Sequence, residues 1–457
     1  MINKTNPLSA AAKISLLVIL CLCAGLLIFI VFSKTPSKKP MQNDSMYRFY
    51  LYNHAVLDSM QKNKALYQYI NEFSDKEKIA QLFMVNIDGS TNYSTDNDFN
   101  DGIAPGAFIF FNFNITSSPA SVIAFTDSVY NYYQGSIPPL LAIDHEGGSV
   151  NRLRSITSPL PSQLSVSKFC TEEEAFSIYE NAAQQLRLLG FTFNLSPVAE
   201  PLYKGNEDFL QDRSFGSIEK TISLSSVSIK AYNEYNILCA LKHFPGNTND
   251  DPHTGLPHIT VSPEIFQSTM IYPFQAILGN TSLHTAVLLS HAVIPSITKN
   301  VPSCFSKDLT TCILKESIGF SGLILTDDIF MAAIADQGYD AYKSVESALL
   351  AGADMIMSSQ KRFIHLLPYI QKRMTEDSLL QSRVNESFNK IIQTKIETKL
   401  LQYHKTSSYD IFTMLPPVNE YILVISKSQY SSIHRERLFT KVKNEGFELY
   451  AAYFNKD

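Results

Sequence analysis

Short apolar runs recur along most of the chain and alternate with amphipathic segments of helical period. Eight of these runs have the length of a strand, and they occupy residues 80–87, 106–111, 139–143, 191–198, 237–241, 286–289, 322–325 and 353–357. Most of the runs are too apolar to face water on either side, which is typical of strands that are covered on both faces in a parallel sheet. The last run is interrupted by one charge, at Asp354.

The segments between the runs carry helix start and stop signals. Thr171 and Glu174 have the spacing of a capping box, Ser262 precedes Pro263 as an N-cap precedes a first-turn proline, and Gly190 follows a helical segment. Eight alternating strand and helix units predict an α/β fold, a TIM-like (β/α)8 barrel. An open, doubly wound parallel sheet is the alternative that the same alternation allows.

Both ends of the chain depart from this repeat. No residue from 14 to 32 is charged, so this run is long enough to cross a bilayer and predicts one N-terminal transmembrane helix. Lysines lie on both sides of it and leave its orientation open, and Cys21 or Cys23 as the lipid-attachment site of a bacterial lipoprotein is the alternative. Beyond two prolines at 416–417, a strand, a helix and a strand predict a small C-terminal βαβ segment.

The predicted domain organisation follows from these patterns. It comprises a membrane anchor and tether at residues 1–40, a linker and leading helix at 41–74, the barrel at 75–401 and the βαβ extension at 402–457.

Composition narrows the functional classes. The 457 residues are 45% hydrophobic and 18% charged, as in a globular protein with a sizeable core. The formal net charge is −5 and no basic cluster is present, which argues against a nucleic-acid partner. The cysteines beyond the N-terminal run lack metal-ligand spacing and do not identify the compartment.

Titratable clusters follow the predicted strands, directly in most cases and within a long connection after the fourth. They lie at residues 144–152 after the third run, 212–216 after the fourth, 242–258 after the fifth, 290–291 after the sixth and 326–328 after the seventh. The carboxyl ends of all strands of a (β/α)8 barrel lie on one face, where barrel enzymes have their active sites. We therefore expect the clusters to form one site, with residues 242–257 as its most polar loop.

Asp251 and His253 are the most informative pair in that loop. A carboxylate two residues before an imidazole can hydrogen-bond one ring nitrogen and raise the basicity of the other, which gives a proton-transfer dyad near neutral pH. The alternative is a capped turn in which the Asp side chain bonds its own backbone.

Four motifs of the chain, in the same order, resemble those of family 3 glycoside hydrolases, specifically the β-N-acetylglucosaminidase branch. They are IDHEGGSVNRLR from Ile143, DRSFG from Asp212, KHFPG from Lys242 with its downstream DPH, and LTDDIFM from Leu325. The resemblance extends over roughly residues 75–400. It departs from the family at Asn247 and Thr248, where relatives usually carry His-Gly, and the segment up to Asp251 is two residues shorter.

The resemblance implies a role for each candidate. Asp327 is the nucleophile that forms a covalent glycosyl-enzyme, and His253 with Asp251 is the acid/base pair. Asp144, Arg152, Arg213, Lys242 and His243 contact the sugar, a role that suits their hydrogen-bonding groups. No metal and no cofactor is implied.

Each of these residues also has a structural alternative. Asp327 is an N-cap candidate for the segment that follows, although Asp328 is the better one. In the structural alternative, Arg213 forms a salt bridge in the neighbourhood of Asp212. Lys242 and His243 would then hydrogen-bond to loop carbonyls and not to a sugar. For two further rim residues the structural role is the prediction, Glu146 as a partner of the turn at 147–148 and His291 as a core histidine.

These observations predict a retaining exo-β-N-acetylglucosaminidase that releases terminal N-acetylglucosamine from cell-wall fragments or related glycans. A monomer is expected, held to the membrane by its N-terminal helix, with the catalytic domain outside the cytoplasm. The alternatives are a glycoside phosphorylase on the same scaffold, a barrel metal enzyme that uses His243, Asp251, His253 and Asp327, and a glycan-binding protein that has lost turnover. The chain has no Trp, so sugar stacking must come from its 29 Phe and 23 Tyr.

Overall fold

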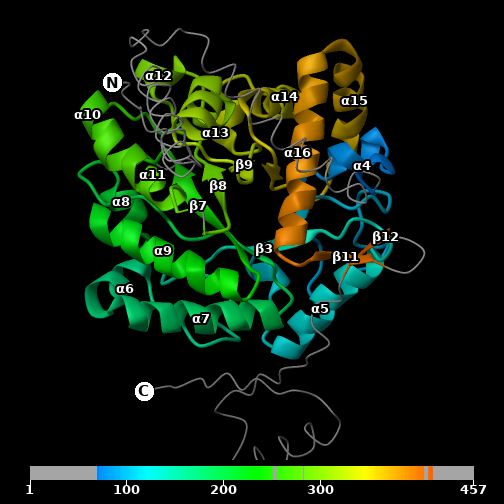
Figure 1. The fold of residues 1–457 in the computed structure, drawn as a ribbon, viewed down its shortest axis with the longest axis horizontal. Helices are drawn as coiled ribbons and strands as arrows, with labels where there is room; N and C mark the ends of the chain where they lie inside the picture. The colour runs from blue at the N-terminus through cyan, green and yellow to red at the C-terminus, as the bar shows by residue number, and fades with distance from the viewer. Residues whose placement is uncertain (1–68, 251–254, 281, 406–409, 415–457) are drawn as a thin grey trace, which may run out of the picture. The chain divides into compact units, whose positions relative to one another are not determined.

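The parallel sheet expected from the apolar runs is present in the computed structural model, which describes residues 69–250, 255–280, 282–405 and 410–414 (Figure 1). Each of its strands overlaps one predicted run. The strands are β1 (Phe83–Asn86), β2 (Ala107–Phe110), β3 (Leu140–Ile143), β6 (Phe193–Asn194), β7 (Leu238–Phe244), β8 (Thr285–Leu289), β9 (Ile324–Thr326) and β10 (Ile356–Ser358).

The order of the strands identifies a barrel. The 8-stranded sheet runs β10-β1-β2-β3-β6-β7-β8-β9, so that neighbours in the chain are neighbours in the sheet and the last strand lies beside the first. Every pair of neighbours is parallel. The parallel bridge Leu325↔Met355 connects the two edges, so the sheet is nearly closed. A doubly wound sheet would instead reverse its strand order midway, so this alternative is wrong.

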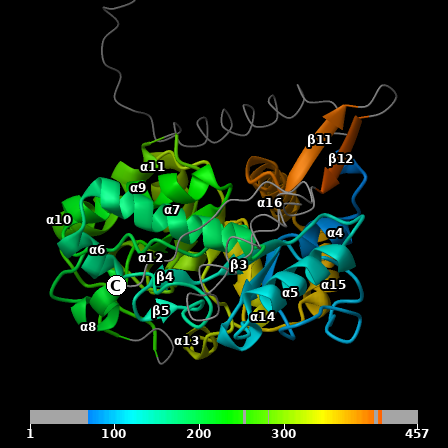
Figure 2. The ribbon, with the colours of Figure 1, turned by 90° about the horizontal axis from the view of Figure 1, so that it is seen from below.

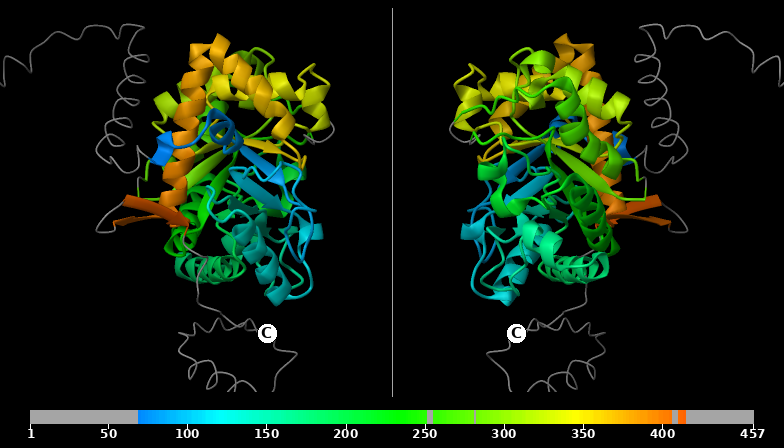
Figure 3. Two further views of the ribbon diagram at one scale, coloured as in Figure 1. Left: turned by 90° about the vertical axis from the view of Figure 1, so that its right-hand side faces the viewer. Right: turned by 90° about the vertical axis from the view of Figure 1, so that its left-hand side faces the viewer.

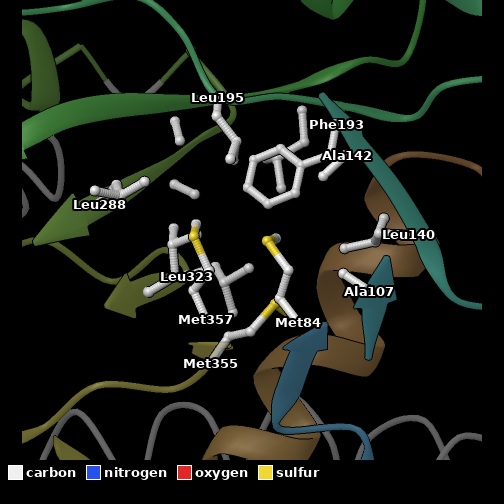
Figure 4. Packing of buried hydrophobic residues seen from close by; sticks show 14 of the residues in the cluster. Met84, Ala107, Leu140, Ala142, Phe193, Leu195, Leu288, Leu323, Met355 and Met357 are labelled. Carbon is white, nitrogen blue, oxygen red and sulfur yellow. The ribbon is translucent and has the colours of Figure 1, made fainter. Parts of the chain in front are cut away.

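Apolar side chains fill the space between the strands. Figure 4 shows ten labelled residues of this core, Met84, Ala107, Leu140, Ala142, Phe193, Leu195, Leu288, Leu323, Met355 and Met357. Met84 and Met355 are fully buried, and their unbranched thioethers fill irregular gaps in the core. The barrel interior is thus packed, and the space for a ligand lies at the ends of the strands.

Helices cover the outside of the sheet (Figures 1 and 3). The α-helices are α4 (Asp75–Ala80), α5 (Pro119–Tyr132), α6 (Gln163–Phe169), α7 (Glu172–Leu188), α8 (Glu207–Leu210), α9 (Ile218–Glu234), α10 (Pro263–Ile265), α11 (Tyr272–Leu278), α12 (Pro295–Thr298), α13 (Ala332–Ala335), α14 (Ala341–Ala351), α15 (Leu367–Glu376) and α16 (Ser378–Glu397). Short 3₁₀ and π segments complete the connections: η1 (Asn112–Asn114), η2 (Gln211–Arg213), η3 (Phe266–Ile271), η4 (Ser303–Phe305), η5 (Asp308–Ser317) and η6 (Ile364–Leu366).

The helix signals read from the sequence are confirmed. Thr171 and Glu174 form both bonds of the capping box at the start of α7. Ser262 caps α10 through the N–H of Ile265, with proline in the first turn. Gly190 follows α7 with φ +85°, and a Cβ there would lie 2.4 Å from the Thr126 hydroxyl, so both conformation and space require glycine.

Two antiparallel hairpins accompany the barrel. One follows β3 directly and pairs β4 (His145–Gly147) with β5 (Val150–Asn151), as Figure 2 shows. The other pairs β11 (Leu401–Lys405) with β12 (Asp410–Met414) at the start of the predicted C-terminal extension, where no hairpin was expected. The βαβ segment itself lies outside the described residues.

The boundary of the fifth strand differs from the expectation. The sequence placed Lys242 and His243 in a loop, but β7 continues to Phe244 and pairs with Leu288 and Leu289 of β8. Their polar side chains are tolerated in a buried strand because carboxylates contact both of them.

The predicted transmembrane helix at residues 14–32 lies outside the described residues. Among the helices that the structure describes, none combines the length and the apolar character that a membrane crossing requires.

Candidate active site

A pocket of about 310 Å³ opens at the carboxyl ends of the strands. Its size falls at the lower end of the range of small-molecule sites. Most of the predicted rim residues contribute to its wall, which consists of Ile109, Phe111, Asp144, Glu146, Val150, Arg152, Leu195, Phe209, Arg213, Lys242, His243, Asn247, Leu288, Asp327, Asp328, Met331 and Met357. All six predicted site residues within the described part of the chain, which are Asp144, Arg152, Arg213, Lys242, His243 and Asp327, lie in this wall.

The β4–β5 hairpin presents two carboxylates to the pocket. Asp144 precedes β4 and Glu146 lies within it, so the alternation of a strand directs both side chains to the same face. The turn between the strands requires glycine, because a Cβ on Gly148 would lie 2.4 Å from an Asp212 oxygen and a Cβ on Gly147 would lie 2.1 Å from the Pro161 carbonyl. The Gly-Gly pair therefore lets the hairpin approach the neighbouring loops closely.

Lys242 connects the two carboxylates. Its Nζ lies 2.7 Å from Asp144 Oδ1 and 2.6 Å from Glu146 Oε1. Arg213 binds the same Glu146 carboxylate with two parallel bonds, Nε to Oε2 at 2.8 Å and a terminal nitrogen to Oε1 at 3.0 Å. Arg152 approaches Asp144 Oδ2 at 4.0 Å. Cations and carboxylates thus alternate along one wall.

This alternation keeps the buried groups charged. Burial raises the pKa of Glu146, but the adjacent Lys242 and Arg213 more than offset this and hold its pKa well below the usual value. Burial lowers the pKa of Lys242, and Asp144 and Glu146 reverse the effect and raise it. Glu146 likewise raises the pKa of Arg213 against the effect of burial. Both cations are therefore available as charged donors for a polar ligand.

Two interpretations of rim residues were wrong. Glu146 was taken as a partner of the glycine turn, yet it binds Lys242 and Arg213. Arg213 in its structural alternative paired near Asp212, whereas Asp212 accepts bonds from the Ser149 hydroxyl and N–H. The true pairs join elements that lie far apart in the sequence, since Arg213 of η2 and Lys242 of β7 both contact Glu146 of β4. Spacing alone cannot reveal such pairs.

His243 is held by Glu200, a residue that the sequence analysis missed. His243 Nδ1 lies 2.6 Å from Glu200 Oε1, and because a carboxylate only accepts, Nδ1 carries the proton. Glu200 also accepts from the N–H of His243 at 3.1 Å and from Asn247, through its N–H at 2.6 Å and its Nδ2 at 3.2 Å. Glu200 was detectable, since it follows the fourth apolar run as Asp144 follows the third.

The bonds to Glu200 show what Asn247 does, at a position where the sequence was expected to depart from the family that it resembles. Asn247 is buried and binds this carboxylate through its backbone and its side chain. The residue therefore supports the site from behind.

Asp327 follows β9 and lies in the same pocket. Its N–H donates to Leu289 O on β8 at 3.1 Å, and its Oδ1 accepts the N–H of Asp328 at 2.8 Å. Burial raises the pKa of Asp327, but His291 and His243, the Asp328 N–H and Lys242 together outweigh burial and lower it below the usual value. The side chain is therefore an ionised carboxylate at neutral pH.

Asp328, the better N-cap candidate in the sequence, does not cap a helix, because the next helix, α13, begins only at Ala332. Its Oδ1 accepts the N–H of Phe330 at 3.0 Å and that of Ser359 at 2.9 Å, so it fixes the turn after β9 to the segment after β10. This leaves the neighbouring Asp327 carboxylate to face the pocket.

His291 is buried and both of its ring nitrogens have partners, as expected of a core histidine. Nε2 lies 2.9 Å from the carbonyl oxygen of Asp328, which only accepts, so Nε2 carries a proton. Nδ1 lies 3.1 Å from the Cys304 sulfur. His291 thus supports the turn that carries Asp327.

Asp251 and His253, the predicted acid/base pair, lie outside the described residues. The described chain on either side runs from β7 to Asp250 and resumes at Gly255. Where the structure describes the chain, no three His, Cys, Asp or Glu side chains gather as a metal site requires.

Comparison with known families identifies the barrel. The model of the glycosyl hydrolase family 3 N-terminal domain matches residues 75–394 of the chain. This range contains all eight strands of the parallel sheet and every predicted site residue.

The chain is also similar to several proteins named beta-hexosaminidase. It is 30% identical over 232 residues to the one from Idiomarina loihiensis, an alignment that covers 49% of this chain and 68% of that protein. It is 27% identical over 273 residues to beta-hexosaminidase LpqI of Mycobacterium tuberculosis, covering 57% and 69%. For beta-hexosaminidase A of Pseudoalteromonas piscicida the identity is 25% over 326 residues, covering 65% of this chain but only 54% of that protein.

Solved structures agree on the fold. A family 3 β-N-acetylglucosaminidase from a Paenibacillus species matches with a TM-score of 0.62 at 24% identity and covers 71% of this chain and 63% of that chain. M. tuberculosis LpqI matches with a TM-score of 0.62 at 23% identity and covers 71% and 94%.

Proposed function

The chain belongs to glycosyl hydrolase family 3, and from this premise we propose that it is a retaining exo-β-N-acetylhexosaminidase that removes terminal N-acetylglucosamine from cell-wall fragments or related glycans. The observation that carries the proposal is the pocket in which the ionised Asp327 carboxylate shares one space with the charged wall of Asp144, Lys242 and Arg213. The names of the relatives point to the same reaction.

The charged wall suits the hydroxyl groups of a terminal pyranose. Asp144 accepts hydrogen bonds, and Arg152, Arg213 and Lys242 donate them. His243 gives its Nδ1 proton to Glu200 and turns Nε2 to the sugar as an acceptor for a hydroxyl group. Because Lys242 is already held by two carboxylates and His243 by Glu200, little side-chain entropy is lost when the sugar binds. The wall would therefore hold the anomeric carbon at a fixed place relative to Asp327.

In the proposed mechanism Asp327 attacks the anomeric carbon and the bond to the leaving-group oxygen breaks. The positive charge that develops on the sugar ring favours an ionised carboxylate at this position, which the lowered pKa of Asp327 supplies. The bond that the Asp328 N–H donates to Oδ1 keeps the carboxylate in one orientation.

The proton for the leaving group comes from His253 in this proposal, with Asp251 orienting its ring. An imidazole, whose usual pKa is about 6.5, is able to donate this proton near neutral pH and later to take one from water. Water then attacks the glycosyl-enzyme at the same carbon, so the product keeps the original configuration.

The test uses the barrel domain, from about residue 63, with aryl and methyl β-N-acetylglucosaminides. Asp327→Asn is expected to lose activity by at least about 10³-fold on both substrates, because no covalent intermediate forms. His253→Ala is expected to lose most activity on the methyl glycoside while an aryl glycoside with a good leaving group still forms the glycosyl-enzyme. Mass spectrometry of the intact protein detects that adduct.

Asp340→Asn serves as the matched control, since Asp340 caps α14 and asparagine caps equally well. An adduct that persists in Asp327→Asn contradicts the assignment of the nucleophile. Phosphate-dependent release of a sugar phosphate identifies a phosphorylase instead, and binding without turnover by the unaltered protein identifies a glycan-binding protein.

A further inference from the structure

A pair of phenylalanine rings extends one wall of the pocket toward solvent. Phe111 follows β2 and lines the pocket, and Phe113 lies two residues later within η1. The two rings are stacked, with centroids 5.9 Å apart and an angle of 13° between their planes. Phe113 is 60% exposed, so the outer ring of the pair faces water beside the pocket.

The turn that carries these rings is fixed. The Phe111 N–H donates to Asn114 Oδ1 at 2.9 Å, and Asn114 is fully buried. Its Nδ2 in turn donates to Ile87 O at 3.1 Å and to Gly89 O at 2.7 Å, in the segment that follows β1. Because a buried side chain anchors the turn to the neighbouring strand, the exposed ring is held in place before any ligand arrives.

The pair is continuous with the charged wall. The Arg152 guanidinium lies over the Phe111 ring, 6.0 Å from its centroid, and the same side chain approaches Asp144. An exposed phenylalanine by itself is normal on a protein surface. Here, however, the exposed ring is stacked on a pocket residue in a chain that has no Trp to stack a sugar.

We propose that Phe111 and Phe113 form a subsite for the sugar residue next to the terminal one. This inference rests on the proposed function: if the pocket takes the terminal residue, the rest of the glycan extends toward solvent, and Phe113 is the exposed ring that stacks on the lining residue Phe111. The C–H face of a pyranose packs on an aromatic ring, as apolar groups do. The preferred substrate is therefore a glycan whose leaving group begins with a pyranose.

The test compares two substrates, methyl β-N-acetylglucosaminide and the β-1,4-linked disaccharide of N-acetylglucosamine. In Phe113→Ala the ratio of kcat/KM for the disaccharide to that for the methyl glycoside is expected to fall about tenfold. Phe113→Tyr keeps a ring and should restore the ratio. Phe169→Ala is the matched control, because Phe169 is 81% exposed at the end of α6 and does not line the pocket.

A binding measurement separates failure of the subsite from failure of the proposed function. Titration calorimetry of the disaccharide into Asp327→Asn, with and without Phe113→Ala, does not depend on turnover, and weaker binding with Phe113→Ala is expected. An unchanged ratio of kcat/KM together with unchanged affinity overturns the subsite even in an active enzyme. An unaltered protein that binds the disaccharide through Phe113 but hydrolyses neither substrate overturns the proposed function and leaves the subsite in place.

Discussion

At the scale of single residues, the pocket is built from side chains that are each held by a partner outside the reacting centre. Glu200 illustrates this. Its side chain is almost fully buried, and its carboxylate accepts four hydrogen bonds, two from His243 and two from Asn247. The bond at His243 Nδ1 fixes the tautomer and leaves Nε2 for the ligand. Glu200 is thus a positioning residue that acts through His243.

Glu200→Gln is expected to raise KM for the methyl glycoside and lower kcat/KM about tenfold, because the amide keeps a hydrogen-bonding shape but loses the charge that orients the imidazole. Glu200→Ala should lose more, since it leaves the donors of His243 and Asn247 without a partner. The check is steady-state kinetics alongside thermal unfolding. Glu207→Gln, at an exposed glutamate of α8, is the matched control. Unchanged kinetics in Glu200→Gln would contradict the positioning role.

At the scale of elements, a buried carboxylate just before β10 binds side chains of the helical segments around the strand. Asp354 interrupts an otherwise apolar run, and it is fully buried between three cations. Arg383 and Lys390 of α16 each lie 3.1 Å from its carboxylate, and Lys315 of η5 lies 3.8 Å away. These cations hold the pKa of Asp354 well below its usual value, against the effect of burial. The charge that looked out of place in a strand ties two outer segments to the barrel.

Lys315 should make the stability of this region depend on pH. Burial lowers its pKa to about 7, and Lys390 and Arg383 act in the same direction while Asp354 and Glu386 oppose them. Between pH 7 and its unfolded value of 10.5, the folded protein therefore binds fewer protons at this site than the unfolded chain. Stability contributed by this group consequently rises with pH in that window, by ~2 kcal/mol from pH 7 to pH 9.

Chemical denaturation of the barrel domain at several pH values checks this prediction. Lys315→Met is expected to flatten the rise between pH 7 and pH 9 relative to the unaltered protein. Lys372→Met is the control, because that lysine of α15 is 75% exposed and its weak pair with Glu376 contributes little. Parallel pH curves for Lys315→Met and the unaltered protein would refute the assignment.

At the scale of the whole molecule, the match to family 3 covers residues 75–394 and leaves segments on both sides. The chain spans 54% of the length of the Pseudoalteromonas relative and 63% of the Paenibacillus structure. The family match does not extend to the segments on either side of residues 75–394, so those segments are interpreted from their sequence. The uncharged run at residues 14–32 still predicts a membrane anchor ahead of the barrel.

The full chain is expected in the membrane pellet of a fractionated cell and to remain there after a high-pH carbonate wash. A chain without residues 1–40 should move to the supernatant and keep its hydrolytic activity, since every candidate site residue lies beyond residue 140. Labelling with a radioactive fatty acid separates the two kinds of anchor: a lipoprotein takes up the label and loses it when Cys21 and Cys23 are both changed to Ala, whereas a plain span takes up none. Recovery of the full chain in the supernatant would rule out both.

The sequence by itself determined the barrel and the membership of its rim. Eight apolar runs that alternate with helices predict parallel strands, and parallel strands place all of their carboxyl ends on one face. The positions of Asp144, Arg213, His243 and Asp327 along the chain were therefore enough to predict that they share one site. The family resemblance then supplied their expected roles.

Only the tertiary structure decided which of these groups contact one another. Lys242 and Asp144 are 98 residues apart, Arg213 and Glu146 are 67 apart, and His243 and Glu200 are 43 apart. These pairs therefore depend on how the strands and the loops that follow them are arranged in space. The extension of β7 through Lys242 and His243 was hidden for the same reason, because polar residues indicate a loop in the sequence, and only the structure shows the distant carboxylates that pair with them. Sequence order fixes which strand end a residue occupies, whereas charge pairing across the barrel depends on three-dimensional distance.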